Sequence, residues 1–189
     1  MKYFFSYLFF TSFLTSCGPK FYDKNDFTFY DKNFALNQNS LLRTDGFYVL
    51  GNSWSKRSND SIEPEKYEVY KFYKTGQSNL ILVDSLKAPQ EYLDLMKEQI
   101  KKYGKGKNEY TLSQGYYKLQ GNKIVIQSVT TVIRQFNYLY GYIENDKLII
   151  VSGTINGKGK FKDKYYNDYN KRIYNFLPYE KVDELEPNW

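Results

Sequence analysis

The chain has 189 residues, of which 41% are hydrophobic, 25% charged and 20% aromatic, and its formal net charge is +6. This balance indicates one globular domain and excludes a disordered chain, a collagen-like repeat and a polytopic membrane protein. The sequence contains no histidine and one cysteine. It therefore excludes Ser-His-Asp and Cys-His catalysis, imidazole metal ligation and intramolecular disulfides.

The amino terminus has the pattern of a secretory signal. Lys2 supplies a positive charge, and residues 3–13 form an apolar run without a charged side chain. As a helix at about 1.5 Å per residue, this run spans roughly 16 Å, about half of the ~30 Å hydrocarbon core of a bilayer. We therefore predict a signal segment that is too short to remain as a membrane anchor.

The four residues after this run resemble the lipobox of bacterial lipoproteins; they are Leu14, Thr15, Ser16 and Cys17. The resemblance implies that residues 1–16 are a cleaved signal peptide and that acyl chains on Cys17 attach the protein to a membrane. Because residue 18 is Gly and not Asp, the same resemblance implies the outer membrane, on either its periplasmic or its exterior face. The alternative is an uncleaved amino terminus in which Cys17 packs as a small hydrophobic residue.

After the lipobox the chain divides into three parts. Residues 17–39 are rich in Asn, Asp, Lys and aromatic residues without a regular period, which predicts a lipidated amino terminus and tether. Residues 40–179 carry short β-rich runs separated by turn residues, which predicts one antiparallel β domain. Residues 180–189 include four acidic residues and are predicted to be a solvated acidic tail.

Three hairpins are predicted in the β domain, after a first strand over residues 45–50. Their turns are centred on Gly76, on Gly121 and on Asn145-Asp146, residue types that tolerate positive φ angles. The paired runs are residues 67–73 with 80–83, 116–119 with 124–133 and 138–144 with 148–155. Successive short hairpins predict a mainly β fold, either an antiparallel β-barrel or a strongly curved meander.

One segment, residues 89–103, has helical periodicity. Its apolar side recurs at helical spacing and contains Tyr92, Leu95, Met96, Gln99, Ile100 and Tyr103. Pro89 stands in the first turn and Gly104 follows the last, as is typical of helix boundaries. We predict a single α-helix that packs over the sheet or covers one end of the barrel.

The signal and lipobox, an Asp45-Gly46-aromatic strand, a Phe-Tyr-x-x-Gly hairpin ending at Gly76 and a Gly-Asn-x-Ile hairpin ending at Ile124 together resemble the lipocalin-like lipoproteins of Bacteroidetes. The resemblance covers about residues 42–155. It implies a lipocalin-like barrel with an apolar cavity, and it names no ligand. The lipocalin Gly-x-Trp is replaced here by Gly46-Phe47-Tyr48.

Tyr138, Tyr140 and Tyr142 alternate along one predicted strand and therefore share one face. If this face points inward, the three side chains form an aromatic wall for a ligand, with hydroxyls to orient it. The alternative is that they pack in the core or form a belt on the outside of the barrel.

Two further patterns are candidates for other roles. Ser61 and Ser85 each stand in an Asp-Ser-aliphatic tripeptide, which resembles the O-glycosylation sequon of exported Bacteroidetes proteins. Residues 104–107 and 157–160 both read Gly-Lys-Gly-Lys. They lack the spacing of a phosphate-binding Walker loop, so we interpret them as solvated turns.

The sequence shows no catalytic constellation, no metal-ligand cluster, no cofactor motif and no nucleic-acid-binding module. We therefore expect a non-enzymatic, lipid-anchored envelope protein that binds a small amphipathic or apolar ligand in its barrel. One alternative is an accessory subunit of an outer-membrane protein complex, which predicts an exposed apolar patch. The other is a hydrolase that uses a pair of carboxylates.

Overall fold

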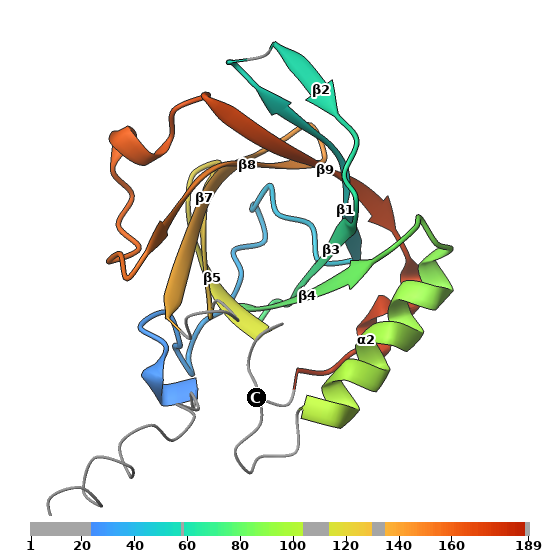
Figure 1. Cartoon of the computed structure of the whole chain (residues 1–189). Helices are drawn as coiled ribbons and strands as arrows, with labels where there is room; N and C mark the ends of the chain where they lie inside the picture. The colour runs from blue at the N-terminus through green and yellow to red at the C-terminus, as the bar shows by residue number, and fades with distance from the viewer. Residues whose placement is uncertain (1–23, 58, 104–113, 130–134, 188–189) are drawn as a thin grey trace, which may run out of the picture.

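The structure is a computed structural model that describes residues 24–57, 59–103, 114–129 and 135–187. It is mainly β, with a closed, lipocalin-like barrel of eight antiparallel strands (Figure 1). In chain order the strands are β1 (Gly46–Ser55), β2 (Asp60–Ile62), β3 (Tyr67–Phe72), β4 (Gln77–Val83), β5 (Gln114–Gln120), β6 (Lys123–Val129), β7 (Phe136–Glu144), β8 (Lys147–Ile155) and β9 (Asn170–Pro178). The predicted fold class is confirmed.

The barrel is closed by β9, which pairs with both β8 and β1. β1 pairs with β3 near Tyr48, and beyond a bulge between Leu50 and Asn52 it pairs with the short β2. The far half of β1 and β2 therefore form a hairpin that extends past the barrel wall (Figure 1). This hairpin and the closing strand β9 were not predicted from the sequence.

The predicted turns are confirmed by their backbone angles. Gly76 and Gly121 have φ angles of 86° and 61°, and Asn145 and Asp146 have φ angles of 50° and 60°. The left-handed region costs little for glycine and is tolerated by Asn and Asp, which explains these residue types at tight hairpin turns. At Gly76 the ring of Phe34 also lies 2.8 Å from the position that a Cβ would take, so a side chain has no room there.

The predicted helix is α2 (Pro89–Tyr103), the only α-helix in the part of the chain that the structure describes. Its apolar side packs on the outer face of β1, β3 and β4 (Figure 1). The contact cluster contains Tyr92, Leu93, Met96 and Ile100 from α2 and Phe47, Val69, Ile81 and Val83 from the strands. The helix therefore covers the side of the barrel and not an end.

The barrel interior is filled by side chains. One cluster of buried residues draws members from strands around the whole barrel, and only the interior brings these together. Its barrel members are Tyr48, Leu50, Tyr70, Phe72, Tyr117, Ile124, Ile126, Ile143, Leu148, Ile150 and Tyr174. An interior of eight strands is just wide enough for such packing.

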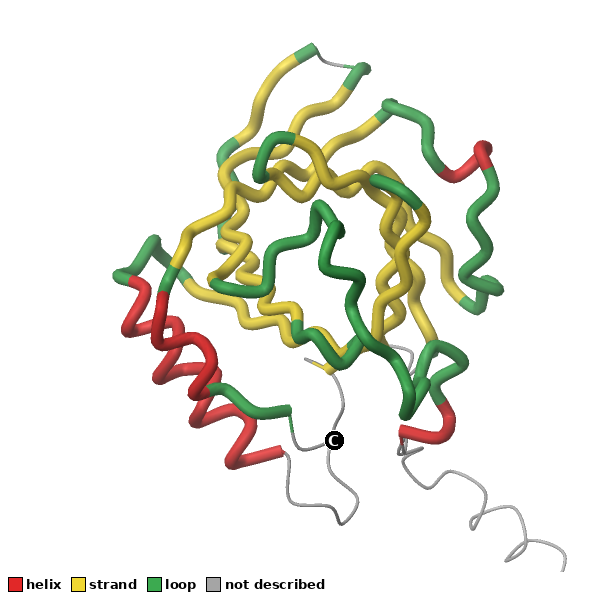
Figure 2. Tube along the Cα trace, turned by 180° about the vertical axis from the view of Figure 1, so that it is seen from behind, coloured by secondary structure: helices red, strands yellow, loops and turns green. Residues whose placement is uncertain are grey.

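Residues 34–45, which we call the strap, cross the end of the barrel where the β3–β4, β5–β6 and β7–β8 hairpins turn (Figure 2). The ring of Phe34 packs edge-on to Tyr117 at 5.4 Å, and the amide of Leu36 donates to the carbonyl of Lys74 at 3.0 Å. Leu42 joins the interior cluster. This end of the barrel is therefore closed.

The predicted tether over residues 17–39 is wrong for its described part, which begins at Lys24 and η1 (Lys24–Asp26). Phe27 and Phe29 are buried against the outer face of β5, β6 and β7, together with aromatic residues of the segment around η2 (Asp163–Tyr165). These isolated aromatics carry no period in the sequence, so their burial depends on a distant surface. Residues 14–17 lie outside the described residues.

The predicted solvated tail over residues 180–189 is also wrong for its described part. It contains η3 (Glu180–Glu184), from which Val182 packs in the α2 cluster together with Leu185. Glu184 forms an ion pair with Lys97 of α2 at 2.5 Å. The acidic residues stay at the surface, whereas the two apolar residues between them are buried.

The strap provides a direct test of this fold. Leu42 is 3% exposed and Leu41 is 56% exposed. We expect Leu42→Ala to lower the free energy of unfolding by about 2–4 kcal/mol because it leaves a cavity in the core. Leu41→Ala is the matched control and should change it by about 0.5 kcal/mol or less. Equal effects of the two substitutions in urea unfolding would show that the strap does not close the barrel.

Candidate ligand-binding mouth of the barrel

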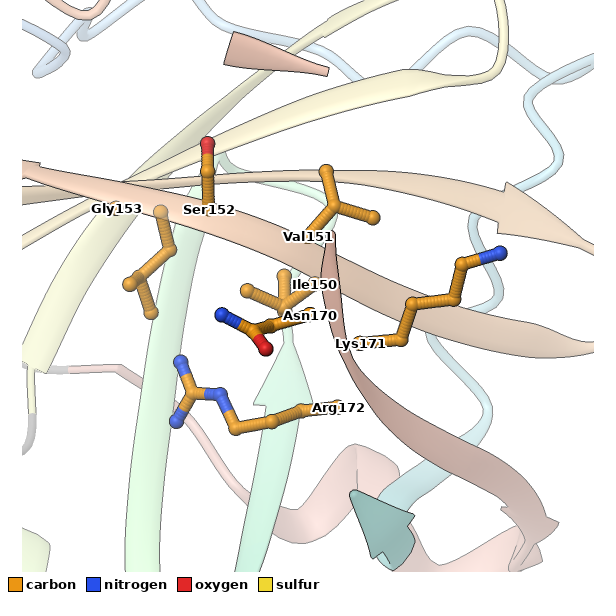
Figure 3. Close-up of a pocket in the computed structure, with 8 residues that line it drawn as sticks. Ile150, Val151, Ser152, Gly153, Asn170, Lys171 and Arg172 are labelled. Atoms are coloured by element: carbon orange, nitrogen blue, oxygen red, sulfur yellow. The ribbon is translucent and has the colours of Figure 1, made fainter. Parts of the chain in front are cut away.

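The end of the barrel opposite the strap is the candidate site, and we call it the mouth. A cavity of about 260 Å³ opens there between β7, β8 and β9. It is lined by Leu139, Ile150, Val151, Ser152, Gly153, Asn170, Lys171 and Arg172. Figure 3 shows the side chains of Ile150, Asn170 and Arg172 on one side of these strands, with Ser152 and Lys171 pointing the other way.

Arg172 of the cavity lining forms an ion pair. Nη1 of Arg172 on β9 donates to both carboxylate oxygens of Glu68 on β3, at 2.7 and 2.8 Å. The hydroxyl of Tyr174 also donates to Glu68. The two charged side chains are 33% and 21% exposed. Because β1 separates β3 from β9, the pair links two strands that are not neighbours.

Burial fixes the protonation of the tyrosines around this pair. It raises the pKa of Tyr174 and of Tyr70, so both hydroxyls remain protonated at neutral pH. Burial alone lowers the pKa of Arg172, but the interactions with Tyr174, Glu68 and Tyr70 outweigh it, and the pKa is raised. The guanidinium is therefore a permanent cation and the hydroxyls are donors.

Arg172 has donors left over after it binds Glu68. Its Nη1 holds the carboxylate, while its Nε and Nη2 have no partner among the residues that the structure describes. A guanidinium carries five N–H donors in a planar fork. In Figure 3 the side-chain amide of Asn170 is drawn between the guanidinium of Arg172 and the aliphatic side chain of Ile150, and all three residues line the cavity. A few polar groups beside apolar side chains are typical of small-molecule sites.

Exposed aliphatic side chains stand at the rim of the mouth. Residues directly opposite each other in antiparallel strands share a face. Ile62 lies opposite Ser53, which lies opposite Arg172, and Leu82 lies opposite Glu68. Since Arg172 and Glu68 face the inside of the barrel, Ile62 and Leu82 project from the same inward-facing surface.

Ile155 follows the same rule. It stands two residues after Gly153, which lies opposite the inward residue Leu139. Ile62, Leu82 and Ile155 are 58%, 61% and 54% exposed. The mouth therefore has an apolar rim above its polar floor, and we use the name rim for these three residues.

Of the two alternatives for Tyr138, Tyr140 and Tyr142, the inward aromatic wall is wrong and packing on the outside of the barrel is confirmed. They do share a face, but it is the outer one, in a cluster separate from the barrel interior. Tyr140 stacks on Tyr165 at 4.5 Å, and the hydroxyl of Tyr142 donates to the carbonyl of Tyr166 at 2.9 Å. Strand alternation predicts that the three residues lie together, not which face they take, because here both faces are covered.

The other predicted sites fall on the surface or outside the described residues. Ser61 and Ser85 are exposed. In the segment 157–160 the two lysines are exposed. Gly159 has a φ angle of 58°, and a Cβ atom at this residue would lie 2.4 Å from the ring of Phe29. This segment therefore packs on the amino-terminal aromatics. Residues 104–107 lie outside the described residues.

Sequence reasoning missed Glu68 and Arg172. They are 104 positions apart in the chain, and charged residues in a strand usually face solvent. The available signal was the alternation of Arg172, Tyr174 and Phe176, which places an arginine on the same face as two aromatics. Such a face is typical of a strand whose buried side includes one polar anchor.

A second buried cation lies outside the mouth, on the outer face of β3. Nζ of Lys71 donates to the backbone carbonyl of Thr44 and lies 5.3 Å from the centre of the Tyr73 ring. Burial lowers the pKa of Lys71 to about 8, although Asp183 and Asp45 raise it in part. The lysine therefore joins the strap to the wall of the barrel, although burial disfavours its charged form.

Comparisons with protein-family models, curated proteins and solved structures find no match for this chain. Among the described residues, no group of three or more Cys, Asp or Glu side chains is placed to hold a metal ion. In the same part of the chain no helix has the length and apolar character needed to cross a membrane. The class is thus defined by the architecture: a closed antiparallel barrel whose strap covers one end, with the cavity at the opposite end.

Lys71 predicts a pH dependence of stability. Its folded pKa of about 8 lies below the unfolded value of about 10.4, so between these pH values the unfolded chain binds the proton that the folded chain has released. Stability therefore rises with pH in this window. Relative to Lys71→Met, the free energy of unfolding of the parent should increase by about 2 kcal/mol from pH 7 to pH 10. Denaturant unfolding of both proteins measures this difference, and a pH-independent difference would contradict it.

Proposed function

We propose that the chain is a lipid-anchored protein of the cell envelope and that the mouth of its barrel binds a small amphipathic molecule without catalysing a reaction. The observation that supports this most directly is Arg172, whose free donors stand in a cavity lined by both apolar and polar side chains, behind an apolar rim. A polar head group satisfies those donors, and an acyl chain covers the rim.

The ion pair suggests the charge of the head group. Glu68 already balances the charge of Arg172, and a second anion on the same guanidinium is repelled by the Glu68 carboxylate at short range. An uncharged acceptor, such as an ester carbonyl or a hydroxyl, meets no such repulsion. We therefore propose a neutral head group with hydrogen-bond acceptors, as in a monoacylglycerol.

The size of the cavity limits how much of the ligand enters. Drug-sized ligands occupy pockets of roughly 300–1,000 Å³, and the mouth cavity is about 260 Å³. The interior beyond it is filled by Tyr70, Tyr174 and the other core side chains. The head group and the first carbons therefore enter, while the rest of an acyl chain lies on the rim.

The proposed anchor rests on the amino-terminal sequence. The signal segment and the lipobox precede Cys17, which is the only cysteine of the chain. Acyl chains there would place the barrel at the bacterial outer membrane. Intact-mass measurement of protein extracted from native membranes should show a chain that begins at Cys17 and carries acyl chains, and Cys17→Ser should retain residues 1–16. An unmodified Cys17 would contradict the anchor.

The alternative role is that of an accessory subunit in an outer-membrane protein complex. The exposed rim favours it, because apolar side chains gathered at one end of a protein often mark a protein contact. In that case a stoichiometric partner should co-purify with the detergent-solubilised protein and be lost when the rim residues are replaced by serine. The ligand-binding function requires no such partner.

The binding proposal predicts a loss of affinity when the anchor is removed. Monodecanoylglycerol, titrated calorimetrically below its micellar concentration, should bind the parent and bind Arg172→Met at least about tenfold more weakly, since a hydrogen bond from a charged donor contributes about 1.5–3 kcal/mol. Arg43→Met is the matched control, because Arg43 lies in the strap at the closed end. It should leave the affinity unchanged.

The role of Glu68 is tested in the same titration. Glu68→Gln removes the balancing charge, so affinity for decanoate should rise relative to monodecanoylglycerol. The double variant with Glu68→Gln and Arg172→Met removes both charges together and controls for misfolding caused by an unpaired carboxylate. Equal affinity of the parent and Arg172→Met for monodecanoylglycerol would overturn the proposed site.

A further inference from the structure

The described chain begins close to the mouth. Phe27 packs against Phe136 at 5.1 Å and against Tyr116 at 5.0 Å. Phe136 is the first residue of β7 and pairs with Val129, the last residue of β6, so both lie at the end of the barrel away from the hairpin turns. Residues 24–27 are therefore attached to the outer wall near the mouth, and the chain runs from there to the strap at the other end.

The length of chain before Lys24 limits where an anchor on Cys17 can lie. Seven steps along the backbone separate the two residues, and at about 3.5 Å per residue they reach about 25 Å when fully extended. A nine-residue strand such as β7 is about 30 Å long, or roughly 23 Å along the axis of a barrel with tilted strands. An anchored membrane thus reaches the mouth easily, whereas contact with the closed end needs nearly the full extension.

The surface of the mouth fits an uncharged apolar partner. The rim offers three aliphatic side chains that are more than half exposed. The exposed charges near it are mixed, with Lys56, Lys66, Asp60 and Asp84 all at this end of the barrel. The four described charges named here balance one another, so they give the mouth no attraction to an anionic surface, and the contact depends on apolar burial.

We infer that the mouth of the barrel docks on the surface of the bilayer that holds Cys17, with Ile62, Leu82 and Ile155 in contact with lipid. The inference rests on the proposed function, because it needs the anchor and uses the same mouth. It adds the source of the ligand: an amphipathic molecule passes between the bilayer and the cavity with its acyl chain on the rim and does not cross water. The closed end then faces away from the membrane.

Hydrogen–deuterium exchange on vesicles tests this orientation. Every contact described above lies within residues 24–187, so the chain from Cys17 onward is suitable material. Its one thiol is coupled to a maleimide lipid in phosphatidylcholine vesicles. On coupling, amides of residues 60–62 and 82–86 should exchange at least about fivefold more slowly, while amides of residues 36–42 in the strap keep their rates.

Matched variants separate docking from simple attachment. Serine at Ile62, Leu82 and Ile155 should abolish the slowing, whereas serine at the exposed residues Leu41 in the strap and Leu95 in α2 should preserve it. Slowing at the strap, or none at the mouth of the parent, overturns the inference, and the parent result stands even if a variant misfolds. Titration of uncoupled protein with monodecanoylglycerol reports the binding function separately, so either claim can fail alone.

Discussion

The interior of an eight-stranded barrel is about as wide as the side chains that fill it, and this constraint governs the molecule. The aromatic and aliphatic residues of β1, β3, β5, β6, β7, β8 and β9 occupy the interior, and the cavity among the described residues lies toward one end. The strap closes one end with Phe34 and Leu42. The candidate site is therefore at the end of the barrel opposite the strap.

The ion pair of Glu68 and Arg172 gives the open end its chemistry. It crosses β1, and the carboxylate of Glu68 also accepts from Tyr174, so three hydrogen bonds from two residues of β9 hold its geometry. A partly buried pair contributes little net stability, because desolvation offsets much of the attraction. The pair holds the guanidinium of Arg172 in one position, so that its free N–H groups stand in the wall of the cavity. The rim lies at the same end of the barrel as this cavity.

Residues with local backbone preferences predicted most of the fold. The site depends on contacts between residues that are far apart in the chain, and the sequence gives no local pattern for these. Gly76, Gly121 and Pro89 mark turns and a helix start through their own backbone preferences, so the hairpins and α2 follow from the sequence. The face of Tyr140 and the packing of Phe27 depend on what covers the outer wall, which no local pattern encodes. For the same reason the chain alone does not reveal which strand completes the barrel.

The central claim is that ligand binds at the open end and nowhere else. Backbone amide NMR during titration with monodecanoylglycerol tests it most directly, because each strand and the strap report separately. The account predicts chemical-shift changes that centre on Glu68, Ile150 and Arg172 and fade along the strands, with the amides of Leu36 and Leu42 unchanged. Changes centred on the strap, or none in the barrel at saturating ligand, would contradict it.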